Sequence, residues 1–121
     1  MKERTNTSQF QNAPAGMYDF KVIGKPEKRR TNNGKSTFRV WEFLISMEGS
    51  QKKTKMTFFP WDSHELLLAV GGILVGEHEV EWDDESVDGK CFQAELYYEK
   101  DKNDAEKEYG RLKNIKETIP F

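Results

Sequence analysis

Residues 38–61 read FRVWEFLISMEGSQKKTKMTFFPW, and a basic segment, KPEKRRTNNGK, precedes them at residues 25–35. The apolar and aromatic run at 38–45 is typical of a β-strand. Glu48-Gly49-Ser50 predicts a turn, and the return half of the stretch interleaves lysines with aromatic residues. A single nucleic-acid strand needs cations for its phosphates and flat rings for its bases. The stretch therefore predicts a β-hairpin that carries a candidate nucleic-acid surface.

The chain has 121 residues, 33% of them charged and 36% hydrophobic, which predicts one domain with a modest core. It has no apolar run near the ~20 residues of a membrane span, and its first residues lack the apolar segment of a signal peptide. Cys91 is the only cysteine, so neither an internal disulfide nor a cysteine-based zinc site is expected. We expect a cytoplasmic protein, in the host cytoplasm if the chain is viral, with no membrane contact, cofactor or metal.

The formal net charge is −2, but the charges are unevenly distributed. Residues 21–55 contain ten cations and three anions, a net charge of +7, whereas residues 61–108 contain four cations and fifteen anions, a net charge of −11. Such a two-sided molecule can attract a polyanion to one face while the other face repels it. The alternative is an ordinary solvated surface on which the charges cluster by chance.

The remaining pattern predicts three further strands and a helix. Residues 17–24 and 92–98 alternate between apolar and polar side chains, and residues 109–116 form the last strand. A cap at Asp62 or Ser63, the apolar run 66–70 and the Gly71-Gly72 pair predict a short helix. Residues 76–81 are expected to form a short extended piece. We expect a flexible arm at 1–13, a folded domain at 14–118 and a separate tip at 119–121.

The strand expected at residues 36–47 does not alternate cleanly. Its apolar residues fall on both faces, with Phe38 and Val40 on one and Trp41, Phe43, Ile45 and Met47 on the other. We expect a β-bulge near Trp41 that lets both groups reach the core in turn, which leaves Arg39 and Trp41 pointing outward. In the return strand we expect two residues inward, Met56 and Phe58, and four outward, Lys53, Lys55, Thr57 and Phe59.

Three strands, a helix and two strands is the order of the OB-fold, a five-stranded Greek-key barrel. We therefore predict an all-β fold with one short helix, placed between the third and fourth strands of an OB barrel. That fold binds oligonucleotides on its second and third strands and on two loops. These parts correspond here to residues 38–61, 25–35 and 100–108. The basic stretch and the expected binding face therefore coincide.

Ala15-Gly16-Met-Tyr-Asp-Phe enters the first strand, Val87-Asp-Gly-Lys90 enters the fourth, and Tyr109-Gly-Arg-Leu-Lys-Asn-Ile-Lys116 forms the last. In these segments the chain resembles the small OB-fold single-stranded DNA-binding proteins of phages and bacteria. The resemblance implies a non-catalytic protein that binds single-stranded DNA and acts in DNA replication or recombination. RNA stays open as a ligand, and so does the formation of a homo-oligomer.

The chain ends with Ile119, Pro120 and Phe121. Bacterial single-stranded DNA-binding proteins end in the same three residues, which dock on partner replication and repair proteins. The resemblance implies a partner-binding tip here, but the acidic tail of that family is missing, with only Glu117 nearby and lysines where acids would be expected. The alternative is that Phe121 packs on the end of the barrel.

The candidate phosphate contacts are the cations of the basic stretch: Lys28, Arg29, Arg30, Lys35, Arg39, Lys53 and Lys55. The candidate stacking residues are Trp41, Phe59 and Trp61, for each of which burial in the core is the alternative. Trp82 lies among acidic residues and is expected to have a structural role. Binding through phosphates predicts an affinity that falls steeply as the salt concentration rises.

Catalytic sites find little support in the sequence. Gly34-Lys35-Ser-Thr37 matches the end of a P-loop, but Arg29 occupies the position of its first glycine and a strand is expected where the motif needs a helix. His64 and His78 are the only histidines, and the acids of 77–85 lack the spacing of a calcium loop. The alternative to nucleic-acid binding is an OB-fold module that binds or assembles with a protein through its aromatic residues.

Overall fold

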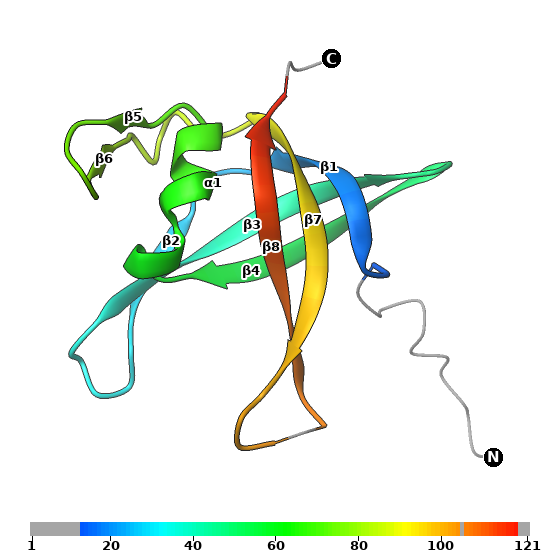
Figure 1. Ribbon diagram of the computed structural model, residues 1–121, viewed down its shortest axis with the longest axis horizontal. Coiled ribbons are helices and arrows are strands. Elements are labelled where there is room, and N and C mark those ends of the chain that lie inside the picture. The colour runs from blue at the N-terminus through cyan, green and yellow to red at the C-terminus, as the bar shows by residue number, and fades with distance from the viewer. Residues whose placement is uncertain (1–12, 105, 119–121) are drawn as a thin grey trace.

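The computed structural model describes residues 13–104 and 106–118 (Figure 1). Its elements, in chain order, are β1 (Gly16–Val22), β2 (Glu27–Arg30), β3 (Thr37–Met47), β4 (Ser50–Phe58), a 3₁₀ helix (Pro60–Asp62), α1 (His64–Ala69), β5 (Ile73–Leu74), β6 (Val80–Glu81), β7 (Cys91–Lys100) and β8 (Glu108–Glu117). The tip at Ile119, Pro120 and Phe121 and residues 1–12 of the expected arm lie outside the described residues. Ala13, the last residue of that arm, is buried.

The main sheet is built around β3. One edge of β3 pairs with β4 over residues 39–47, and the other edge is shared by β2 over residues 37–40 and by β1 over residues 43–46. β7 then pairs with β1, and β8 pairs with β7, all in antiparallel fashion. Within the described residues α1 is the one α-helix, and the predicted all-β fold with a short helix is confirmed.

Residues 27–30, expected in a loop, form the edge strand β2. β3 extends past the end of β1, and its free edge at residues 37–40 needs hydrogen-bond partners. The chain supplies them by folding back on itself, so that Arg29 pairs with Phe38 and Arg30 with Thr37. A turn at residues 32–34 makes this return, with Gly34 at a φ of 70° that favours glycine.

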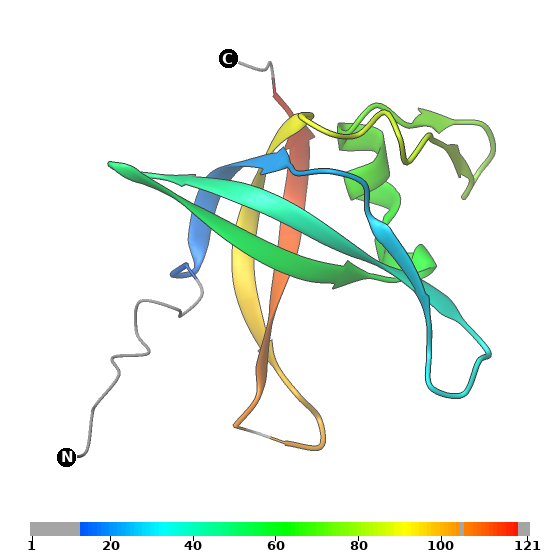
Figure 2. The same ribbon diagram turned by 180° about the vertical axis from the view of Figure 1, so that it is seen from behind.

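The core lies between two layers of the coiled sheet. Figure 2 shows the β3–β4 hairpin crossing in front of β7 and β8. The side chains buried between these layers and α1 include Phe20, Val22, Trp41, Phe43, Ile45, Met56, Phe58, Leu66, Phe92, Ala94 and Leu96. Phe20 of β1 stacks on Phe92 of β7, with ring centroids 5.1 Å apart. No strand pairing in the described part of the chain joins β4 to β8, so hydrogen bonds do not close the sheet.

Trp41 points into this core, so the outward orientation expected for it is wrong. Its side chain is 1% exposed, and Phe43 on the same face of β3 is fully buried. The register between β3 and β4 has no shift, so the expected bulge does not form. Phe38 and Val40 stay half-buried on the opposite face, where the Phe38 ring lies 5.5 Å from that of Phe59. A second aromatic cluster, and not a bulge, therefore accounts for the two apolar faces of β3.

α1 ends at Ala69, slightly earlier than expected, and it lies against β8. A Cβ atom at Gly72 would lie 2.6 Å from the carbonyl oxygen of Leu67 and 2.6 Å from Cγ1 of Val80. Glycine at this position therefore permits the β5–β6 hairpin to fold back closely against the helix. In the described ranges, no helix has the length and apolar character needed to cross a membrane.

Candidate nucleic-acid interface

The outer face of β4 carries exposed cations, as the sequence predicts. Met56 and Phe58 are buried, whereas Lys53, Lys55 and Thr57 are exposed. This alternation follows from the period of two in a strand that covers a core on one side. The lysines therefore project from the face of the sheet that lies opposite the core.

Phe38, Phe59 and Trp61 form an aromatic cluster at the end of the β3–β4 hairpin, in which Phe59 and Trp61 are stacked and Phe38 is tilted against Phe59. Arg39 pairs with Phe58, so the residues next to them, Phe38 and Phe59, share the outer face. Trp61 lies on Phe59 with ring centroids 4.6 Å apart and ring planes 12° apart. Because Trp61 is still 71% exposed, the stack presents a large, pre-oriented ring of the kind on which a base can stack.

Hydrogen bonds hold the turn that carries Trp61. The carboxylate of Asp62 accepts from the Phe59 N–H at 2.6 Å and from Arg111 Nη1 at 3.2 Å. The hydroxyl of Ser63 donates to the carbonyl oxygen of Phe59. Burial raises the pKa of Asp62 above its ordinary value, and this effect outweighs those hydrogen bonds and the charge of Arg111. The position of Trp61 is therefore set by β8 as well as by the hairpin.

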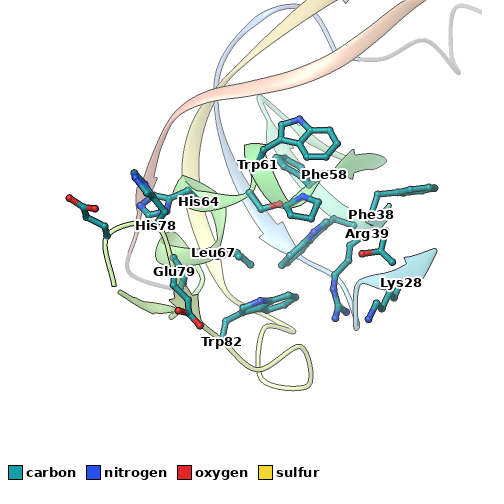
Figure 3. Close-up of a pocket in the computed structure, with 16 residues that line it drawn as sticks. Lys28, Phe38, Arg39, Phe58, Trp61, His64, Leu67, His78, Glu79 and Trp82 are labelled. Carbon is teal, nitrogen blue, oxygen red and sulfur yellow. The ribbon is translucent and has the colours of Figure 1, made fainter. Parts of the chain in front are cut away.

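A pocket of about 720 Å³ opens beside Trp61, between the paired ends of β2 and β3, the 3₁₀ helix, α1 and the β5–β6 hairpin. Its apolar lining includes Phe38, Trp41, Phe58, Trp61, Leu67 and Trp82. Figure 3 shows Lys28 and Arg39 on one side of it and His64, His78 and Glu79 on the other. The volume lies within the ~300–1,000 Å³ of small-molecule sites.

Trp82 forms one wall of this pocket, although the sequence indicated a structural role for it. It is half-buried and stacks on Trp41 with ring centroids 5.6 Å apart. The Arg39 guanidinium lies 4.8 Å from the Trp82 ring centroid, a cation–π distance. Arg39 Nη1 in turn donates to Asp84 Oδ2 at 2.9 Å. The structural role predicted for Trp82 rests on the acidic residues that surround it in the sequence. One of them, Asp84, is neutralised in the structure by Arg39 of β3.

The predicted cations and aromatic residues lie on two surfaces, which Trp61 connects. Lys28 and Arg39 line the pocket, whereas Lys53 and Lys55 project from the outer face of β4. Trp61 lines the pocket and also stacks on Phe59 of the outer face. A strand that follows the lysines of β4 would therefore reach the pocket at Trp61.

The other predicted cations belong to the basic segment at β2. Arg30 and Lys35 are exposed. Arg29 is exposed as well, but its Nη2 lies 2.9 Å from Glu27 Oε2, and this hydrogen bond and the charge of Arg29 lower the pKa of Glu27. An exposed pair of this kind is weak, so a phosphate can compete with Glu27 for Arg29.

The acidic segment touches the start of the basic one. Lys25 Nζ lies 3.9 Å from Asp84 Oδ2 and 3.7 Å from Glu85 Oε1. Asp84 also pairs with Arg39, and both side chains are about one-quarter exposed. Arg39 was predicted as an outward phosphate contact; it instead lies on the core face of β3 with a carboxylate partner already in place.

The pocket also contains residues that the sequence did not single out for binding. His64 comes from the first turn of α1, and Glu77, His78 and Glu79 come from the β5–β6 hairpin. No local motif connects these positions with Trp61, because Gly72 brings the hairpin to the helix only in the folded chain. In the part of the chain that the structure describes, no three His, Cys, Asp or Glu side chains are grouped so as to hold a metal ion.

No protein-family model and no curated protein matches this chain. The function is therefore inferred from the site itself.

Proposed function

We propose that the protein binds single-stranded DNA, without catalysing a reaction, in DNA replication or recombination. The observation that carries this proposal is the continuity from exposed lysines on β4, through the aromatic cluster of Phe38, Phe59 and Trp61, into the aromatic pocket. Phosphates need cations and bases need rings, and both follow one path here. RNA offers the same two groups and remains the related ligand to compare.

An OB-type barrel is the architecture that we propose for this function. Among the strands of the main sheet, β1 lies between β3 and β7, β4 pairs with β3, and β8 pairs with β7. This is the order of neighbouring strands in the OB-fold, except that β4 and β8 are not hydrogen-bonded to each other. α1 falls between β4 and β7 in the chain, as in that fold. A Cβ atom at Gly110 of β8 would lie 3.6 Å from Met56 Cε of β4. Side-chain packing between β4 and β8 thus supports a barrel closed without hydrogen bonds.

A fluorescence titration tests the proposal. The protein is mixed with a mixed-sequence single-stranded 20-mer at about 50 and 200 mM salt, where neutralised phosphates make affinity strongly salt-dependent. We expect quenching of the tryptophan emission, weaker binding at the higher salt concentration, and weaker binding to the corresponding duplex. A folded protein that shows no quenching at the lower salt concentration would refute the proposal. A matched RNA 20-mer in the same titration compares the two nucleic acids.

The exposure of Ile73, Leu74 and Val75 favours the second candidate, a protein-interaction module. These consecutive residues of the β5–β6 hairpin are 67%, 52% and 52% exposed, and contiguous exposed apolar residues often mark contacts with proteins. This candidate predicts that neither the folded wild type nor an Ile73→Ser/Leu74→Ser variant binds the 20-mer. It becomes the better explanation if that result is found.

A further inference from the structure

The pocket beside Trp61 has two polar sides of opposite charge. Lys28 and Arg39 lie on one side, with Glu79 on the side opposite them in Figure 3. Glu77 and Glu79 line the pocket from the segment between β5 and β6. Figure 3 shows the two tryptophans, Trp61 and Trp82, at the other two sides of the pocket. A ligand that fills this space therefore meets positive charge at one end, negative charge at the other, and aromatic rings between.

The charges decide which end of a nucleotide goes where. A phosphate is repelled by Glu77 and Glu79 and attracted by Lys28, which is exposed on the edge strand β2. Arg39 already pairs with Asp84, so Lys28 is the principal cation for a phosphate. The base is uncharged and flat, so it occupies the space between the rings of Trp61 and Trp82, with its polar edge toward the β5–β6 hairpin.

The acidic side also distinguishes one base from another. An ionised carboxylate can only accept hydrogen bonds. Cytosine presents the N4 amino group, a donor, where thymine presents the O4 atom, an acceptor. An acceptor placed against Glu77 or Glu79 is repelled and finds no donor, whereas an amino group is bound. His64 and His78, which line the same side, each offer one donor and one acceptor when neutral and accept either base.

We propose that the pocket holds one nucleotide of the bound strand, with its phosphate at Lys28 and its base edge at Glu77 and Glu79, and that it selects bases with an exocyclic amino group. This inference rests on the proposed function and specifies which bases that function prefers. Each well-formed base contact discriminates by ~1–3 kcal/mol. We therefore expect cytosine to be preferred over thymine by about tenfold per occupied pocket, from the lower half of that range.

The experiment compares dC12 with dT12 at one salt concentration and at pH 7.5, where dC12 does not fold on itself. Binding is measured by tryptophan quenching with the wild type, with a Glu77→Gln/Glu79→Gln variant and with a Glu65→Gln/Glu81→Gln control. The control removes the same charge from two exposed residues that do not line the pocket. An amide both donates and accepts, so the pocket variant is expected to bind the two oligonucleotides almost equally. The control is expected to bind both more tightly and to keep the wild-type ratio.

Each outcome has a separate meaning. Equal binding of dC12 and dT12 by the wild type overturns the base selection and leaves the proposed function intact. A wild-type preference that persists in the Glu77→Gln/Glu79→Gln variant, or is lost equally in the control, overturns the role of the carboxylates. Binding of neither oligonucleotide by the folded protein overturns both the inference and the proposed function.

Discussion

Trp61 stacks on Phe59 with ring centroids 4.6 Å apart and planes 12° apart, yet 71% of its surface is exposed to solvent. A tryptophan with that much exposure contributes little to the core, but its orientation is fixed by Phe59 and by the turn that Asp62 holds. A ring that is ordered before binding loses little conformational entropy when a base stacks on it. We therefore place Trp61 at the centre of the proposed interface.

Trp61→Ala is expected to weaken binding of the single-stranded 20-mer by about 5- to 150-fold, because a stacked base is worth ~1–3 kcal/mol. Trp61→Phe keeps a ring on Phe59 and is expected to lose only part of that affinity. Fluorescence anisotropy of a labelled oligonucleotide gives both values. Chemical denaturation should give nearly the same stability for the three proteins, and an unchanged affinity in Trp61→Ala would remove Trp61 from the interface.

Trp41→Ala is expected to reduce mainly the stability of the fold, whereas Trp82→Ala is expected to reduce mainly oligonucleotide binding. Trp41 is fully buried, so its truncation is expected to cost ~3–5 kcal/mol of unfolding free energy. Trp82 is half-buried, and its truncation is expected to cost less stability while removing a wall of the pocket. Urea denaturation monitored by circular dichroism measures the first effect, and oligonucleotide binding measures the second. A stable, well-folded Trp41→Ala variant would contradict the burial of this residue.

Asp84→Asn is expected to increase the affinity for single-stranded DNA. Arg39 Nη1 lies 2.9 Å from Asp84 Oδ2, and loss of this charge releases Arg39 toward the pocket. We expect binding to become tighter by about two- to fivefold, which corresponds to the free energy of a partly exposed ion pair. The salt dependence of the affinity is expected to become steeper by roughly one phosphate contact. Glu85→Gln is the control, since Glu85 lies near Lys25 but makes no ion pair with Arg39. Equal gains in the two variants would indicate a general charge effect.

Gly72→Ala is expected to displace the β5–β6 hairpin. The added Cβ would lie 2.6 Å from the Leu67 carbonyl oxygen and from Val80 Cγ1. Overpacking of this kind typically lowers the free energy of unfolding by ~1–3 kcal/mol. Gly76→Ala on the same hairpin is the control, because its Cβ would lie 3.6 Å from the nearest atom. Thermal unfolding measures the stability of both variants. A Gly72→Ala protein as stable as Gly76→Ala would mean that the hairpin does not need this close approach.

The alternation of β4 and the apolar character of β3 are local patterns, and both were predicted correctly. Met56 and Phe58 point inward and Lys53 and Lys55 outward because successive strand residues point to opposite faces. The hairpin and the short helix that follows it in the chain were predicted from the same kind of signal. β2 was missed because its residues have no strand pattern of their own, and they pair only because β3 extends beyond β1.

By itself the sequence determined that this is a β-rich chain with one short helix and a basic, aromatic hairpin, since these properties depend on neighbouring residues. Only the tertiary structure decided that Trp41 is buried and that Trp82 forms a half-buried wall of the pocket, stacked on Trp41. Two apolar faces on β3 look alike in the sequence, and the choice between them depends on which face β1, β7 and α1 cover. The position of Trp82 depends on Arg39 and Trp41 from another part of the chain, so no local pattern could predict it.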